Sequence, residues 1–331
     1  METLHQQLQQ GDRVAISAIA GMGGVGKTEL AIQYAHAYKG LFEGGICWFY
    51  AREQNIVTQI VGYAMVQLGL YIPDGLEPSD RVAYCWRNWR EGDVLIVLDD
   101  VVNYQEIKPY LPPEEKRFKV LMTTRLKFGK PIKTLPLGVL KPEQSLELLE
   151  SFIGQERILA EEAVAQTLCE WLGHLPLGIE LVGRYLEDDE TLSLAEILFR
   201  LQQKAKQRKS LEDESLESPD PDTNTMTAER GVKAAFELSW EVLDPDSQHL
   251  GKLLCLFALA PIEWELIEKV ERQYCQEEGT FQENVLKKSR KTLLKFHLVR
   301  GLEQNRYQLH SLIREFFRGK LEGEPDVTVS R

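Results

Sequence analysis

The feature that most constrains this chain is a glycine-rich stretch near its start, AGMGGVGKT at residues 20–28. An apolar run at residues 14–19 precedes it, and a helical pattern at residues 29–35 follows it. Glycines let successive backbone N–H groups turn toward an anion, and the start of a helix adds partial positive charge. The pattern GxxxxGK[ST] between a strand and a helix is that of a phosphate-binding loop.

Each position of this loop has an expected role. Lys27 is expected to reach the β- and γ-phosphates of a nucleotide, and the Thr28 hydroxyl to ligate Mg²⁺. The residues expected to bind the phosphates are Gly21, Gly23, Gly24, Val25, Gly26, Lys27, Thr28 and Glu29.

Two other interpretations of the glycines stay open. One is a purely structural turn. The other is the dinucleotide fingerprint GxGxxG, which needs an acidic residue about 20 positions on, at the end of the next strand. Glu53 is the nearest candidate and comes late. The Lys-Thr pair after the last glycine has a role only in the phosphate-binding loop.

A second motif, DVLIVLDD at residues 93–100, places two aspartates after five apolar residues. Such a run is typical of a parallel strand buried on both faces. The acidic pair then lies at the carboxyl edge, where open α/β sheets bind ligands. We expect Asp99 to hold Mg²⁺, directly or through water, and Asp100 to orient or deprotonate the attacking water. The alternative is two exposed carboxylates that cap the next helix.

The run FKVLMTTR at residues 118–125 predicts a further buried strand that ends in hydroxyls and a cation. Arg125 is expected to meet the γ-phosphate and stabilise its charge; the alternative is a surface arginine. We predict two more strands, at residues 45–50 and 133–140, and Pro136 places the second of them at an edge or a bend. The fold class predicted is therefore α/β, with a parallel five-stranded sheet.

Composition limits the class of protein. A formal net charge of −12 argues against a general nucleic-acid or membrane-surface binder. No run of about 18 apolar residues is present, and the first residues lack the basic start and apolar core of a signal peptide. The five cysteines form no CxxC pair and fit reduced thiols. We expect a cytoplasmic protein with no membrane partner, for which nucleic acid is an unlikely partner by charge, and we expect Trp86 and Trp89 to pack in a core.

The second half of the chain is predicted to be helical. Amphipathic patterns cover residues 144–153, 156–172, 177–186 and 194–206, and further helices are expected at 232–240, 245–258 and 285–295. The segment LGHLPLG at residues 172–178 combines a helix stop with a proline at a helix start. A hairpin near residues 298–309 then suggests a winged-helix unit.

Together these motifs resemble NB-ARC ATPases, which belong to the STAND class of signalling NTPases. That class includes plant disease-resistance proteins, apoptosome scaffolds and bacterial regulators. Residues 21–28 match the family's phosphate-binding loop, residues 95–100 its Walker B segment, and residues 121–125 its arginine-bearing sensor.

Two later segments extend the resemblance. Residues 172–178 are similar to the family's GLPL motif, which implies that Pro176 packs near the adenine. His310 matches the histidine of the MHD motif, which implies a contact with the β-phosphate of ADP, while Leu309 and Ser311 replace the Met and the Asp. From the residues alone, His310 also fits a histidine that caps a packed helix.

The resemblance implies a P-loop domain, an all-helical domain and a winged-helix domain. The expected boundaries are 1–140 for the P-loop α/β domain, 141–207 for the helical domain, 208–227 for an acidic flexible loop, 228–322 for the winged helix and 323–331 for a disordered tail. It also implies a switch that binds ADP or ATP with Mg²⁺, hydrolyses ATP slowly, and engages protein partners or itself in the ATP form. Two alternatives are a DNA-binding regulator that uses the winged helix and a metabolic phosphotransferase.

Overall fold

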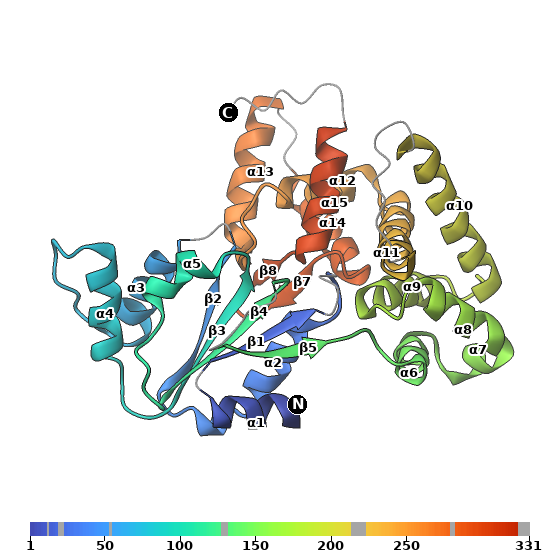
Figure 1. Ribbon diagram of the computed structural model, residues 1–331. Coiled ribbons are helices and arrows are strands. Elements are labelled where there is room, and N and C mark those ends of the chain that lie inside the picture. Colours follow the sequence, from blue (N-terminus) through green and yellow to red (C-terminus); the bar gives the residue numbers. More distant parts are fainter. Residues whose placement is uncertain are drawn as a thin grey trace. The chain divides into compact units, whose positions relative to one another are not determined.

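The computed structural model describes residues 1–11, 13–18, 23–52, 55–126, 132–212, 223–278 and 282–323. Contacts divide the chain into two compact units, residues 1–138 and residues 139–331. Figure 1 labels most of the helices and strands of both. Among the described residues, no helix combines the length and the apolarity that crossing a bilayer requires.

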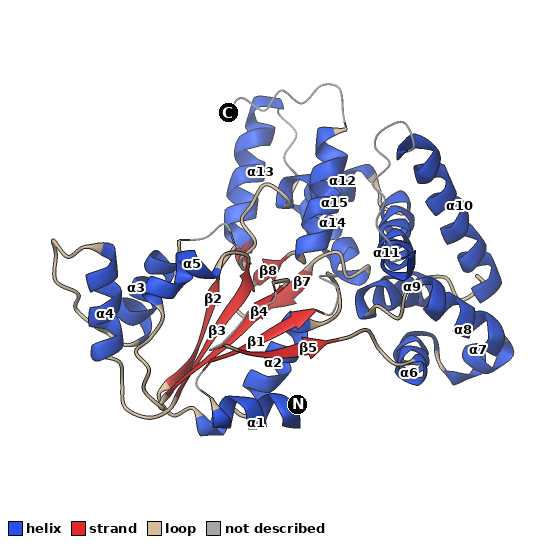
Figure 2. Cartoon of the chain, in the orientation of Figure 1, coloured by secondary structure: helices blue, strands red, loops and turns tan. Residues whose placement is uncertain are grey.

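The first unit is built on a parallel five-stranded sheet, which confirms the predicted fold class. Its strands are β1 (Arg13–Ala18), β2 (Gly45–Tyr50), β3 (Val94–Val101), β4 (Phe118–Thr124) and β5 (Lys133–Leu137), and its main helices are α1 (Glu2–Gln10), α2 (Lys27–Ala37), α3 (Ile56–Gln67), α4 (Pro78–Arg87) and α5 (Tyr104–Ile107). The strand order is β2-β3-β4-β1-β5, so β5 lies at an edge, as Pro136 predicted. Figure 2 shows the strands in red.

The apolar run of β3 is explained by burial on both sides of the sheet. Leu95 and Val97 pack in one cluster with residues of α1 and α2. Ile96 and Leu98 pack in the other cluster, with residues of α3 and α4. Successive side chains of a strand point to opposite faces, so a strand covered on both faces needs apolar residues at every position. This packing fixes β3 in the middle of the sheet and carries its polar end to the carboxyl edge.

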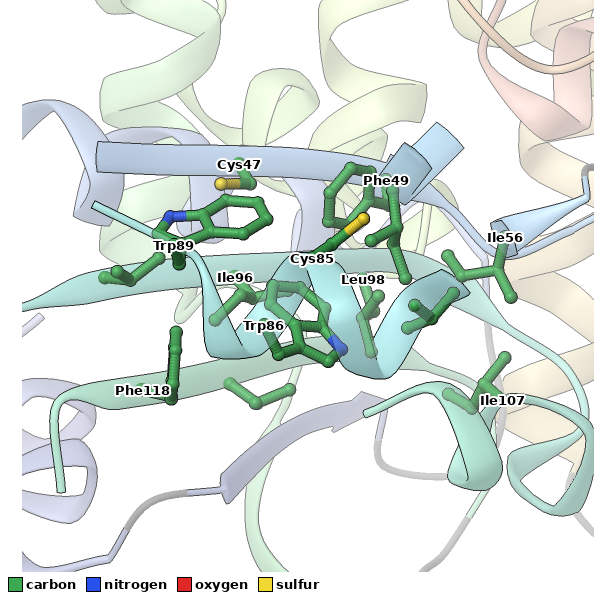
Figure 3. Close-up of a cluster of buried hydrophobic side chains, with 14 of the residues drawn as sticks. Cys47, Phe49, Ile56, Cys85, Trp86, Trp89, Ile96, Leu98, Ile107 and Phe118 are labelled. Atoms are coloured by element: carbon green, nitrogen blue, oxygen red, sulfur yellow. The ribbon is translucent and has the colours of Figure 1, made fainter. Parts of the chain in front are cut away.

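Trp86 and Trp89 belong to the second of these clusters, which Figure 3 shows in close-up. Their ring centroids lie 4.7 Å apart, and each side chain is 4% exposed. The indole N–H of Trp86 donates to the carbonyl of Tyr110, and that of Trp89 to the carbonyl of Gly44. Both rings are therefore core residues with satisfied polar atoms, as predicted.

The second unit is mainly helical. Its helices are α6 (Pro142–Ile153), α7 (Gln155–Ala160), α8 (Glu162–Trp171), α9 (Pro176–Asp188), α10 (Leu194–Glu212), α11 (Thr223–Glu241), α12 (Pro245–Leu254), α13 (Trp264–Glu278), α14 (Glu283–Lys295) and α15 (Ser311–Glu322). Three short antiparallel strands, β6 (Ile262–Glu263), β7 (Arg300–Leu302) and β8 (Arg306–Gln308), pair in the order β6-β8-β7. Both the predicted helical domain and the predicted winged helix lie in this unit, and their division stays a prediction.

Several predicted elements differ from the observed ones. The helix expected over 156–172 is two helices, because the chain leaves the helical conformation at Glu161, whose carboxylate accepts the N–H groups of Leu194 and Ala195 at the start of α10. The helix expected over 245–258 ends at Leu254.

The acidic loop expected over 208–227 is shorter, since α10 runs to Glu212 and α11 begins at Thr223, and residues 213–222 lie outside the described residues. Most of the tail expected over 323–331 also lies outside them.

Candidate functional site

The phosphate-binding loop connects β1 to α2, and its described part is Gly23–Gly26. Gly24 and Gly26 have φ angles of 75° and 95°, in the left-handed region where a Cβ atom is disfavoured. Gly26 directly precedes α2, which begins at Lys27. Val25, 5% exposed, anchors the loop in the core. Gly21 lies outside the described residues, so its expected phosphate contact stays a prediction.

A hydrogen bond joins this loop to β3. The Thr28 hydroxyl donates to Oδ1 of Asp99 over 2.9 Å. Asp99 is 6% exposed, and Thr123 of β4 donates a second hydroxyl to the same oxygen. Burial raises the pKa of the Asp99 carboxyl, while the hydrogen bonds from Thr123 and Thr28 oppose that rise. The two predicted motifs therefore meet in one polar cluster at the carboxyl edge of the sheet.

Asp100 is held differently from its neighbour. Its φ of 55° is left-handed, and the pairing of β3 with β4 shifts register between Leu98 and Val101. The backbone N–H of Asp100 donates to the Thr123 hydroxyl over 2.8 Å.

Neither aspartate caps the next helix, which was the alternative interpretation, because Asn103 is the N-cap of α5 and accepts the N–H of Gln105. The acidic pair thus belongs to the site rather than to a helix start.

Lys27 lies within the electrostatic reach of three charged residues of this edge. Burial lowers the pKa of the Lys27 ammonium, the positive charge of Arg125 lowers it further, and Asp100 and Asp99 oppose both effects. An anion bound at Lys27 and Arg125 would relieve the repulsion between them. Lys27, Asp99, Asp100 and Arg125 are thus brought close to one another, as expected. Glu29 has an exposed side chain that accepts from Gln33, and its expected role in binding stays a prediction.

The donor atoms suit a magnesium ion. Mg²⁺ prefers hard oxygen ligands at about 2.1 Å in octahedral geometry, which places neighbouring ligand oxygens about 3 Å apart. The hydroxyl of Thr28 and the carboxylate of Asp99 are such donors, and they are 2.9 Å apart. These two residues are the ones that would hold Mg²⁺ here.

Pro176 and His310 lie in the second unit. Pro176 is the first residue of α9, after Gly173 and His174 with φ angles of 63° and 53°. The imidazole of His174 is hydrogen-bonded to the Ser145 hydroxyl, so His174 is held within the second unit. His310 is the N-cap of α15, and its Nδ1 accepts the N–H of Leu312. The capping interpretation of His310 is therefore confirmed, while the contacts of Pro176 and His310 with a nucleotide stay predictions.

Two residues of the site escaped the sequence interpretation. Thr123 bridges the acidic pair, but the sequence indicated only that hydroxyls end this strand. Arg52, which follows β2, lies 3.3 Å from the Asp100 carboxylate. Its position beside Asp100 depends on β2 being the neighbour of β3, and no local pattern reveals that order.

Comparison with known proteins agrees with this geometry. Residues 1–159 match the model of the NB-ARC domain. The regulatory protein AfsR of Streptomyces griseus is 28% identical over 334 residues, which cover 97% of this chain and 31% of that protein. The probable disease resistance RPP8-like protein 2 of Arabidopsis thaliana is 28% identical over 210 residues, which cover 58% of this chain and 23% of that protein. The chain thus spans less than a third of either relative.

Solved structures resemble the chain more distantly. A Walker-type ATPase of Pyrococcus abyssi has a TM-score of 0.41 and 13% identity, covering 96% of this chain and 94% of that one. The ORC2 protein of Aeropyrum pernix, in complexes with ADPNP and ADP, has a TM-score of 0.31 and 15% identity, covering 97% of this chain and 91% of that one. The family match carries more weight: residues 1–159 of this chain match the model of the NB-ARC domain, the family that the three motifs resemble.

Proposed function

We propose that this chain is a signalling switch that binds ADP or ATP and is set by which of the two it holds. In this proposal the ADP form is closed, exchange for ATP opens it, and slow hydrolysis of ATP returns it to the closed form. The open form engages protein partners or further copies of itself. Relatives named for regulation and for disease resistance support a signalling role.

The observation that carries the proposal is the hydrogen bond between Thr28 and Asp99. It joins the first turn of α2 to the end of β3, two segments that a P-loop NTPase uses together to hold Mg²⁺. Neither the structural-turn nor the dinucleotide interpretation of the glycines requires this contact. Mg²⁺ held by these two residues would supply charge neutralisation for the phosphates.

The remaining residues have complementary tasks. Lys27 and the N–H groups at the start of α2 bind phosphate oxygens, which concentrate negative charge at the helix N-terminus. Arg125 senses the γ-phosphate, the group that distinguishes ATP from ADP. Asp100 orients water for attack and accepts its proton. A ligand shifts a two-state equilibrium only through its differential affinity, so Arg125 is the natural point of discrimination between the two nucleotides.

His310 is proposed to favour ADP. Because its Nδ1 accepts a hydrogen bond, the proton of a neutral imidazole lies on Nε2, which can then donate to a phosphate oxygen. A coupling of about 3 kcal/mol would change the affinity ratio of the two nucleotides about 150-fold.

Nucleotide binding is tested with Lys27→Ala. The purified protein is denatured, any released nucleotide is identified by chromatography, and thermal shifts with ADP or ATP and Mg²⁺ are measured. Loss of a charged hydrogen bond of about 1.5–3 kcal/mol predicts about a 10- to 100-fold weaker affinity. Lys39→Ala, an exposed lysine just after α2, is the matched control and should bind as the parent does. Equal affinity of the Lys27 variant and the parent would refute the proposal.

The switch itself is tested with His310→Asn. Asparagine is a good N-cap, so this variant keeps the cap of α15 while removing the imidazole. We expect a similar melting temperature and a lower ratio of ADP to ATP affinity. An unchanged ratio would leave His310 a helix cap and nothing more.

The charges on α14 argue against the DNA-binding alternative. Lys287 pairs with Glu283, Lys288 with Asp244, and Lys295 with Asp188. The guanidinium of Arg290 lies over the rings of Trp264 and Tyr307. Most of the basic residues of this helix thus have partners within the second unit. A gel shift with duplex DNA at two salt concentrations tests the alternative, because phosphate-driven binding weakens steeply with salt.

A further inference from the structure

Two charged side chains from neighbouring strands meet at the carboxyl edge of the first unit. Arg52 follows β2, and Asp100 lies near the end of β3, which pairs with β2 through Tyr50 and Asp99. Nη1 of Arg52 lies 3.3 Å from Oδ2 of Asp100, and the two side chains are 29% and 24% exposed. Because the strands are parallel, this pair lies at the same edge as the phosphate-binding loop.

The backbone of Asp100 leaves its carboxylate few positions. The residue is in the left-handed conformation, and its N–H is fixed by the Thr123 hydroxyl. Only the side-chain torsions remain to set where the carboxylate points. Within the part of the chain that the structure describes, Oδ2 is buried and makes no hydrogen bond of good geometry, so the ion pair with Arg52 is its principal polar contact.

We propose that Arg52 is a positioning residue that restrains ATP hydrolysis by holding the Asp100 carboxylate toward the end of β2. This inference rests on the proposed function. In that hydrolysis, the oxygen of water bonds to the γ-phosphorus while the bond to the β,γ-bridging oxygen breaks. ADP leaves, and the proton of the water passes to Asp100 and then to the released phosphate.

The Asp100 oxygen that pairs with Arg52 is directed at the guanidinium rather than at water. This orientation slows the step in which Asp100 takes the proton, and it does not act on the phosphate contacts of Lys27 or Thr28. The restraint should therefore change the rate of hydrolysis and leave nucleotide affinity unaltered.

The test is single-turnover hydrolysis of ATP with Mg²⁺ and excess protein, in parallel with measured affinities for ADP and ATP. Arg52→Ala should hydrolyse ATP about two- to fivefold faster than the parent, the range that a partly exposed ion pair supports, with unchanged affinities. Arg52→Lys keeps the charge and should stay near the parent rate. Arg87→Ala, an exposed arginine at the end of α4, is the matched control and should not change the rate.

A double variant tests whether Arg52 acts through Asp100. In Asp100→Asn protein, Arg52→Ala should have no effect on the remaining rate, because the partner that it acts on is gone. Acceleration that persists in this background overturns the proposal, as does an Arg52→Ala rate at or below that of the parent. If neither the parent nor the variants bind nucleotide, the proposed function itself is wrong. If they bind nucleotide and Arg52→Ala does not accelerate hydrolysis, only the proposed role of Arg52 is wrong.

Discussion

The Thr123 hydroxyl is a small group, but its removal should destabilise the site strongly because it contacts both aspartates. It donates to the buried Asp99 carboxylate and accepts the N–H of Asp100, and the side chain is 2% exposed. Thr123→Val keeps the shape of the side chain and removes the hydroxyl. Asp99 then loses one of two hydroxyl donors, and the Asp100 N–H loses its partner.

The magnitude follows from the two lost contacts. A hydrogen bond to a charged group contributes about 1.5–3 kcal/mol, and a buried donor left without a partner costs about 1–3 kcal/mol. We expect the lower end of each range, because Thr28 still donates to Asp99 and the site is only partly closed to water. The free energy of unfolding should fall by about 2–3 kcal/mol.

Urea unfolding, followed by circular dichroism and tryptophan fluorescence, measures this loss. The dependence on urea should keep its slope, since the surface exposed on unfolding is unchanged. Thr123→Ser is the matched control: it keeps the hydroxyl, loses one methyl group and should cost about 1 kcal/mol. If Val destabilises no more than Ser, the hydroxyl does not hold the acidic pair, and the account of the site geometry is wrong.

Two further predictions concern backbone conformation and pH. Gly26→Ala should destabilise the protein by about 1–2 kcal/mol, because the φ of Gly26 is 95°. Gly62→Ala, inside α3 and with equally open space around the added methyl group, should stabilise the protein by about 0.5–1 kcal/mol. Equal melting temperatures of the two variants would contradict this prediction.

The hydrogen bond with Glu271 raises the pKa of His249, so its stabilisation is complete below about pH 6.5 and is lost as pH rises through the raised pKa. The gap in unfolding free energy between the parent and His249→Asn should thus be larger at pH 6 than at pH 8.5, by no more than about 1 kcal/mol because the His249 side chain is 45% exposed. An equal gap at both pH values would count against the ion pair.

The sheet could be predicted because its strands carry local signals. The apolar run before Asp99 indicated burial on both faces, and the position of Pro136 indicated an edge. The meeting of Thr28 with Asp99 followed from two motifs that each specify an edge of the sheet. These parts of the fold and the site depend on residue type and spacing alone.

The rest depends on contacts between distant segments. The left-handed conformation of Asp100 accompanies a register shift between β3 and β4. The presence of an aspartate in the sequence does not predict such a shift. Arg52 reaches the site because of strand order. The break at Glu161 reflects its use as a cap for α10, and the sequence interpretation did not predict α13.

The position of β1 has a consequence for synthesis. Of the five strands of this sheet, β1 is synthesised before the others, yet its two neighbours are β4 and β5, with Val14 beside Leu121 and Lys133. At about 5–20 residues per second, a nascent chain waits roughly 5–20 s before the first partner of β1 appears. During that interval the backbone edges of β1 lack both of their partners in the sheet. The nascent chain can then associate wrongly with other chains, and a chaperone that covers this apolar strand would prevent it.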